Sequence, residues 1–168
     1  MLYRLEVNMI TLRKITEDNF IECINLEVKE DQRKFAAHNM FSLAEAYVDL
    51  TNGYCIPTPY AIYEDETMVG FIMLAYYEAD EDDDDDETVY KVCRLMIDKK
   101  YQGLGYGRKA MEKALELIRQ FPCGKADLVV LSYNPDNTAA RNLYAAIGFQ
   151  ETGEMNGNEV WAVLRLTP

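Results

Sequence analysis

The sequence of 168 residues is poor in the side chains from which metal centres and disulfide networks are built. It has a single histidine, His38, and no partners at a spacing that would make a zinc site or a serine–histidine relay around it. We therefore expect His38 to be a surface or core residue, and we expect no metal site. The four cysteines, Cys23, Cys55, Cys93 and Cys123, are far apart and form no Cys-x-x-Cys pair. Since a secretory leader is also missing, we expect reduced thiols in a cytoplasmic protein.

Positive charge is scarce as well, because 17 lysines and arginines stand against 29 acidic residues, giving a net charge of −12. Such a chain is not drawn to phosphate backbones or anionic membranes, so we expect neither nucleic acid nor membrane partners. No apolar run approaches the roughly 20 residues that span a bilayer. The acidic surface suits a cationic partner, and eight consecutive acidic residues run from Asp80 to Glu87.

The length and the hydrophobic fraction of 49% fit one globular domain over residues 1–168. Alternating apolar residues predict a strand over 9–15, and near-helical spacing predicts a helix over 17–30. The capping-box signature Ser-x-x-Glu at 42–45 predicts a second helix that ends near Leu50.

Three strands are predicted next, at 60–63, 69–77 and 88–97, and the first two form a hairpin. The clearest amphipathic helix covers 104–121. The continuous apolar run at 127–133 is typical of a strand that is covered on both faces. A strand, a helix and a strand in this order imply one right-handed parallel crossover.

The remaining elements are a short helix over 137–147 that Gly148 ends, and a hairpin. The hairpin joins 149–154 to 159–166 through a turn at Asn156-Gly157. The fold class that these patterns predict is a mixed α+β domain, with a mostly antiparallel sheet, one parallel crossover and flanking helices.

A glycine-rich loop, Gln102–Arg108, lies between the strand at 88–97 and the helix that follows. Glycines let a ligand approach the backbone, and the first turn of a helix offers free N–H groups and a positive dipole end to anions. The loop therefore indicates either a diphosphate site or only a tight connection. A Walker loop is excluded because Arg108 and Lys109 follow its last glycine, and a dinucleotide fingerprint would come earlier in the chain.

Downstream residues add a second motif that decides between these interpretations. After Gln102, Gly105 and Gly107 the chain has, in order and at regular spacing, Asn137, Ala140, Leu143, Tyr144, Gly148 and Phe149. In this pattern the sequence resembles the GNAT acetyltransferase superfamily over residues 88–166, and the element order of 9–77 also fits. The strings at 97–103 and 42–47 resemble the bacterial diamine/spermine acetyltransferase branch.

The resemblance implies an acetyl-CoA-dependent N-acetyltransferase in which the acceptor amine attacks directly. It implies that the loop anchors the cofactor diphosphate, that fourth-strand N–H groups receive the developing oxyanion and face the pantetheine arm, and that a tyrosine is the general acid. The cofactor-binding residues so implied are Leu95, Met96, Ile97, Gln102, Gly103, Leu104, Gly105, Tyr106, Gly107, Arg108 and Asn137.

Tyr144 occupies the general-acid position of this family. A phenol with a pKa of about 10 is a competent proton donor to a thiolate whose acid has a pKa of about 8.5. Without the flanking motif, Tyr144 would be read as a core aromatic residue on an amphipathic helix. Asn137 lies seven residues earlier on the same helix face, which favours the catalytic role.

The general base is left unassigned by the sequence. Related animal polyamine enzymes carry acidic residues on the fourth strand, but Cys93 and Arg94 stand at the aligned positions here. Cys93 as an acyl-accepting nucleophile is an alternative, although a buried strand cysteine is usually inert. The places to look for a base are Glu27, Glu45, Tyr76, Tyr77 and Glu78.

The substrate indicated by the branch resemblance is a small polyamine such as spermidine or spermine. A protein N-terminus, a lysine, an amino acid or an aminoglycoside are alternatives within the fold, and a non-catalytic acyl-CoA-binding module is an alternative outside this enzyme class. The run 80–87 is either a solvated connection or a negative funnel for a polycation. Homodimers occur often in the family, so the resemblance also allows a homodimer.

Overall fold

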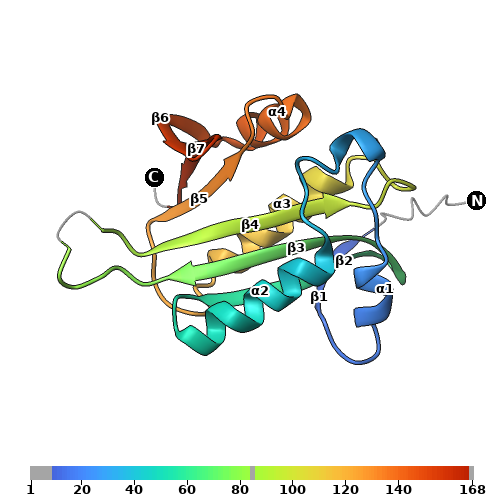
Figure 1. The fold of residues 1–168 in the computed structure, drawn as a ribbon, viewed down its shortest axis with the longest axis horizontal. Helices are drawn as coiled ribbons and strands as arrows, with labels where there is room; N and C mark the ends of the chain where they lie inside the picture. Colours follow the sequence, from blue (N-terminus) through green and yellow to red (C-terminus); the bar gives the residue numbers. More distant parts are fainter. Residues whose placement is uncertain (1–8, 84–85, 167–168) are drawn as a thin grey trace, which may run out of the picture.

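A seven-stranded sheet with the order β1-β2-β3-β4-β5-β7-β6 runs through the molecule (Figure 1). The computed structural model describes residues 9–83 and 86–166. The strands are β1 (Ile10–Lys14), β2 (Ile56–Glu64), β3 (Thr67–Tyr77), β4 (Val89–Ile97), β5 (Leu128–Tyr133), β6 (Gln150–Asn156) and β7 (Glu159–Arg165). Among the strands of these described residues, β4 and β5 are the one pair that runs in parallel. The predicted fold class and the β2–β3 hairpin are therefore confirmed.

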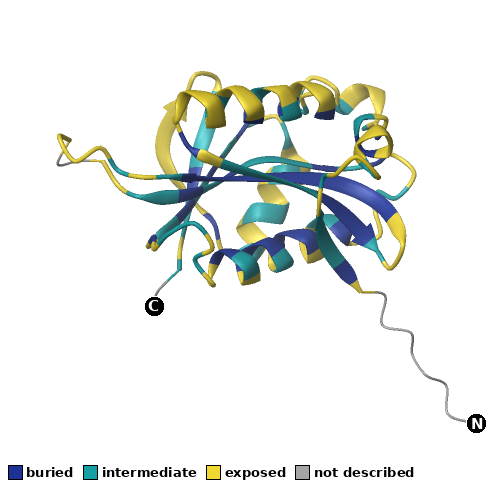
Figure 2. Cartoon of the chain, turned by 90° about the horizontal axis from the view of Figure 1, so that it is seen from below, coloured by how far each residue is buried: buried dark blue, intermediate teal, exposed yellow. Residues whose placement is uncertain are grey.

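The helices cover both faces of this sheet, and Figure 2 shows the sheet as a buried layer between their exposed outer sides. The elements are α1 (Phe20–Ile24), the 3-10 turn η1 (Glu30–Gln32), α2 (Asn39–Asn52), α3 (Tyr106–Ile118) and α4 (Thr138–Ile147). Helices α1 and α2 contact β3 and β2 on one face, and α3 lies on the other face with α4 beside it.

The strand that is covered on both faces is β3, whose successive side chains enter two separate cores. Ile72 packs in the core under α3, and Phe71 and Met73 pack in the core under α1 and α2. The prediction of such burial for 127–133 is wrong, because β5 alternates between buried and half-buried residues. Helices α1 and α2 lie over β2 and β3, so one face of β5 stays open to a cavity.

The prediction of one helix over 17–30 is also wrong, because α1 ends at Ile24. The chain then runs past the end of β4, where the Glu27 N–H donates to Asp98 Oδ2 at 3.0 Å and the Lys99 N–H donates to the Glu27 carbonyl at 2.7 Å. These long-range hydrogen bonds need an extended chain, and they override the local helical pattern.

Helix α2 begins three residues before the predicted capping box. His38 is its N-cap, and His38 Nδ1 accepts a hydrogen bond from the Met40 N–H at 3.2 Å. Ser42 is instead buried inside the helix and donates to the His38 carbonyl at 3.4 Å. The predicted stop is confirmed, because Gly53 ends the helix with a left-handed φ of 71°. The terminal hairpin turns at residues 157 and 158, one position later than predicted, because Asn156 pairs with Glu159.

Gly70 on β3 lies where the sheet leaves no room for a side chain. A Cβ atom at this position would overlap the Met96 carbonyl oxygen of β4 and would approach Ile97 Cδ1 at 2.9 Å. We expect Gly70→Ala to lower the free energy of unfolding by about 1–3 kcal/mol, since overpacking forces backbone shifts. Urea unfolding measures this difference.

Gly107→Ala is the matched control, because its Cβ would meet Leu143 Cδ2 and Ile97 Cγ1 only at ordinary distances of 3.7 and 3.8 Å. A Gly70→Ala protein as stable as the wild type would show that β3 and β4 are less tightly packed than the structure indicates.

Candidate active site

The parallel pairing between β4 and β5 lasts for three residue pairs, from Val89↔Leu128 to Lys91↔Val130. Beyond this point β4 stays paired with β3, and β5 stays paired with β7. The two strands separate, so their facing edges no longer hydrogen-bond to each other. Backbone N–H groups of β4 beyond residue 91 are left available to a ligand.

A cavity of about 460 Å³ begins where these strands separate. It brings together residues of β4, the glycine loop, α4 and the segment 25–38. Of the predicted cofactor-binding and catalytic residues, those that line it are Leu95, Met96, Ile97, Gln102, Gly103, Gly105, Tyr106, Gly107, Arg108, Asn137 and Tyr144. Leu104 does not line it, since this side chain points into solvent with 58% of its surface exposed.

The glycine loop places the start of α3 at the end of this cavity. Gly103 and Gly105 both have a left-handed φ of 80°, a conformation that favours glycine. The helix begins at Tyr106, two residues later than predicted, and its first turn contains no acidic residue. Its free N–H groups form a ready anion site.

Tyr106 lines the cavity and is also part of the core under α3. Its side chain is 7% exposed and lies in the core. The hydrogen bond to Glu64, together with burial, raises the pKa of the Tyr106 hydroxyl to about 12.

Gln102 braces the loop. Its Nε2 donates to the Ile97 carbonyl at 2.9 Å and to Gln32 Oε1 at 2.8 Å. The side chain thus ties the loop both to the end of β4 and to η1, which the sequence motif did not reveal.

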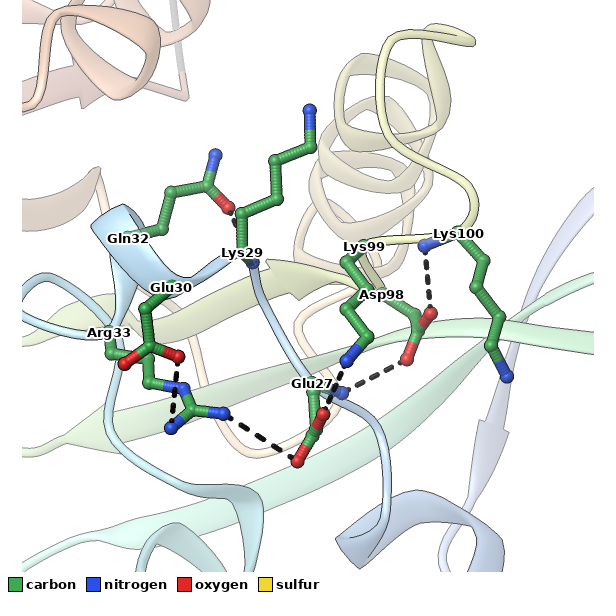
Figure 3. A network of polar contacts seen from close by, with 8 residues as sticks. All are labelled: Glu27, Lys29, Glu30, Gln32, Arg33, Asp98, Lys99 and Lys100. Carbon is green, nitrogen blue, oxygen red and sulfur yellow. Dashed lines mark hydrogen bonds and ion pairs between the residues drawn. The ribbon is translucent and has the colours of Figure 1, made fainter.

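The segment 25–38 forms a wall that the sequence did not predict. Its residues Val28, Gln32, Phe35 and Ala36 line the cavity of about 460 Å³. Figure 3 shows the polar network that holds it against the end of β4. Asp98 is 5% exposed and accepts hydrogen bonds from the N–H groups of Glu27 and Lys100.

Glu27, one of the places named for a base, is fully engaged in this network. It pairs with Lys99 at 2.6 Å and with Arg33 at 3.8 Å. The hydrogen bond from Lys99 lowers the pKa of Glu27 below its usual range. A carboxylate held in this way stabilises the wall, and it does not line the cavity of about 460 Å³.

Tyr144 lies in the gap between β4 and β5, on a helix that Asn137 caps. Asn137 Oδ1 accepts from the Ala140 N–H at 3.2 Å, so this residue fixes the start of α4 two turns before Tyr144. The Tyr144 ring packs against Tyr133 and Phe149, with centroids 5.5 and 5.9 Å apart.

Burial raises the pKa of Tyr144 to about 12, and the nearby Tyr133 and Glu159 contribute to the rise. The hydroxyl is therefore protonated throughout the neutral pH range, as a proton donor must be.

A second, adjoining cavity opens from the first, and Leu95, Met96, Asn137 and Tyr144 line both. Its walls are β4, the carboxyl end of β5, the start of β7 and residues 33–39. The charged residues that line it are Arg33, Lys34, Lys91, Arg94 and Glu159.

Two of these cations are neutralised by carboxylates. Arg94 pairs with Glu45 at 2.7 Å, and Arg33 pairs with Glu30 at 3.2 Å. Glu45, another of the places named for a base, is therefore held in an ion pair with Arg94. Lys91 and Lys34 lie over the rings of Trp161 and Phe35.

Cys93 lines the adjoining cavity and is the extra residue of a β-bulge in β4. Burial raises its pKa to about 11, so it is a thiol rather than a nucleophilic thiolate near neutral pH. The other places named for a base, Tyr76, Tyr77 and Glu78, do not line either cavity.

A family model described as "Acetyltransferase (GNAT) family" matches residues 11–149. The chain belongs to the GNAT acetyltransferase family. It is accordingly an N-acetyltransferase that uses acetyl-CoA, which confirms the predicted resemblance and enzyme class.

Relatives and solved structures agree with this assignment. The spermine/spermidine N(1)-acetyltransferase of Bacillus subtilis is 27% identical over 150 residues, 89% of this chain and 93% of that protein. An aminoglycoside acetyltransferase in complex with coenzyme A has a TM-score of 0.70 at 19% identity, covering 94% of this chain and 95% of that one. The Vibrio cholerae spermidine N-acetyltransferase in complex with CoA and spermine has a TM-score of 0.65 at 14% identity, with the same coverage. These two likenesses show the fold.

Over 9–83 and 86–166, no group of three metal-ligating side chains gathers at one place. Within the same ranges, no helix has both the length and the apolar character needed to cross a bilayer.

The cavity end at Gly107 gives a direct test of diphosphate binding. We expect Gly107→Val to raise the dissociation constant of coenzyme A roughly tenfold or more, because hydrogen bonds to charged groups are worth about 1.5–3 kcal/mol. The valine methyl groups would block the approach to the N–H groups of α3. Calorimetric titration measures the effect.

Gly107→Ala is the control and should bind more tightly than Gly107→Val, since a lone Cβ makes only ordinary contacts there. Equal affinities for wild type and a folded Gly107→Val protein would move the diphosphate away from this loop.

Proposed function

We propose that this protein acetylates a polyamine or diamine by direct attack of a primary amine on acetyl-CoA in a ternary complex. The observation that carries direct transfer is the junction of the two cavities at Leu95, Met96 and Tyr144. A thioester in one cavity and an amine in the other would meet there. The polyamine is supported by the relative from Bacillus subtilis that acts on spermine and spermidine.

The residues present fit the proposed cofactor. The N-terminus of α3 is free of acidic residues and suits a diphosphate, and Leu95, Met96 and Leu143 offer apolar surface to a pantetheine arm. When bound, the thioester would supply an activated acetyl group. The unpaired edge of β4 offers N–H groups to the carbonyl oxygen, which gains negative charge as the amine attacks.

Tyr144 is proposed as the general acid that protonates the departing sulfur. Its pKa of about 12 keeps the proton on the phenol until it is needed. A thiolate formed beside Tyr144 would be shielded from solvent like the phenol, and such burial raises the basicity of an anion. The raised pKa of the donor is therefore matched by a more basic acceptor. Direct transfer is also favoured because the alternative nucleophile, Cys93, is protonated near neutral pH.

A second candidate acceptor is an amine that carries an anionic group, such as an amino acid or a peptide N-terminus with an acidic side chain. The observation that favours it is the lining of the adjoining cavity, where Lys34 and Lys91 contact aromatic rings rather than carboxylates. Thiol release from acetyl-CoA with spermine, a monoamine and an acidic dipeptide would rank the candidates. Release with none of them would favour the non-catalytic alternative.

Replacement of Tyr144 by phenylalanine tests the acid. We expect Tyr144→Phe to lower turnover by about 10²- to 10⁴-fold, the usual contribution of a general acid. Because the pKa of Tyr144 is about 12, the loss should be the same at every pH from about 6 to 9. The dissociation constant of coenzyme A should stay unchanged, since the ring remains. Wild-type turnover would assign the proton to water or to another residue.

The acidic run 80–87 tests the polyamine. Its described residues, 80–83 and 86–87, lie in the projecting β3–β4 connection, at the opposite end of β4 from the glycine loop, and residues 84 and 85 are outside the described ranges (Figure 1). We expect replacement of its acidic residues by Ser and Asn to lower kcat/KM for spermine more than for a monoamine. Salt should shrink the difference, because screening acts beyond about 8 Å at physiological ionic strength.

Turnover at saturating spermine should hardly change in this variant. Equal losses for both amines, or losses independent of salt, would leave the run as a solvated connection.

A further inference from the structure

None of the groups assigned so far takes the proton that the acceptor amine must lose before it can attack. A primary amine with a pKa near 10 is almost wholly protonated at neutral pH and cannot attack as an ammonium. Of the carboxylates in the described residues, Glu159 alone lines the adjoining cavity. It is the first residue of β7, and sequence reasoning passed over it because it lies beyond the family motifs.

Ser132 holds the Glu159 carboxylate in place. The β5–β7 register pairs Ser132 with Trp161, so Ser132, Trp161 and Glu159 share one face of the sheet. Ser132 Oγ donates to Glu159 Oε2 at 2.6 Å. A carboxylate has about four acceptor positions, so this single hydrogen bond leaves room for a bound ammonium.

Glu159 and Tyr144 approach the gap between β4 and β5 from opposite faces of the sheet. Tyr133 and Val160, which pair with each other, point to the face opposite Glu159, and the Tyr144 ring packs against Tyr133. The two groups are still close enough for the charge of Glu159 to contribute to the raised pKa of Tyr144. A carbonyl held between the strands would have a proton acceptor on one side and a proton donor on the other.

We propose that Glu159 is the general base of this acetyltransferase and that Ser132 positions it; the inference rests on the proposed function. Glu159 takes one proton from the ammonium and passes it to water. The freed lone pair forms the C–N bond and the C–S bond breaks. The sulfur receives the proton of Tyr144, and Tyr144 regains one from the second N–H of the nitrogen. The products are the amide, the free thiol and one proton.

The charges around Glu159 support this role. Four cations line the same cavity. Arg33 and Arg94 pair with carboxylates, whereas Lys34 and Lys91 lie over aromatic rings and keep their charge uncompensated by these ion pairs. An ammonium bound there has Glu159 as its favourable contact, and nearby cations disfavour its charged form. The contact places an N–H of the ammonium against the carboxylate, and repulsion from the nearby cations eases the loss of that proton.

The experiment compares Glu159→Gln with Glu154→Gln, an exposed residue of the same hairpin that lines neither cavity. At neutral pH we expect Glu159→Gln to lower kcat for a strongly basic amine by about 10²-fold or more. The loss should diminish as the pH approaches the amine's own pKa, and it should be much smaller for a weakly basic amine that is already neutral. A merely structural role would change both amines alike at every pH.

Ser132→Ala keeps the carboxylate and should show the same pH signature at reduced size, which preserves the test if Glu159→Gln folds poorly. Glu154→Gln should match the wild type. A folded Glu159→Gln protein with the wild-type pH profile on both amines would overturn the inference. Absence of thiol release from the wild-type protein with every amine would instead overturn the proposed function.

Discussion

Parallel pairing that stops at Lys91↔Val130 is the constraint on which the rest of the site depends. Had the strands stayed paired, the N–H groups of β4 would be used within the sheet, and no cavity could pass between β4 and β5. The outer strands keep the separation stable, because β3 still pairs with β4 up to Ile97 and β7 pairs with β5 up to Tyr133. Both edges are thus anchored on one side and open on the other.

Polar side chains at the ends of elements, rather than within them, complete the site. Asp98 and Gln102 tie the segment 25–38 and the glycine loop to the end of β4, and Asn137 fixes the start of α4. Each of these groups satisfies backbone atoms that would otherwise be left unpaired, which is costly in a buried setting. The same contacts therefore stabilise the fold and fix the shape of the cavities.

The sequence predicted the strands and the site motifs well where local pattern and packing agree. Gly53 and Gly148 end their helices as expected, and the predicted site residues from Leu95 to Tyr144, apart from Leu104, gather around one cavity. It failed at the segment 25–38, where hydrogen bonds to residues 98 and 99, some 70 positions away, decide the backbone path. Glu159 was missed because it lies beyond the family motifs, and it is the β5–β7 register that brings it beside Ser132.

The β4–β5 junction also has a kinetic consequence. Strands β2, β3 and β4 form from consecutive hairpins, whereas the junction joins residues 39 positions apart, such as Val89 and Leu128, across a helical crossover. Loop closure of this kind costs chain entropy before the contacts repay it. During folding the antiparallel half is therefore expected to form first, and the cleft, which belongs to neither half alone, to assemble last.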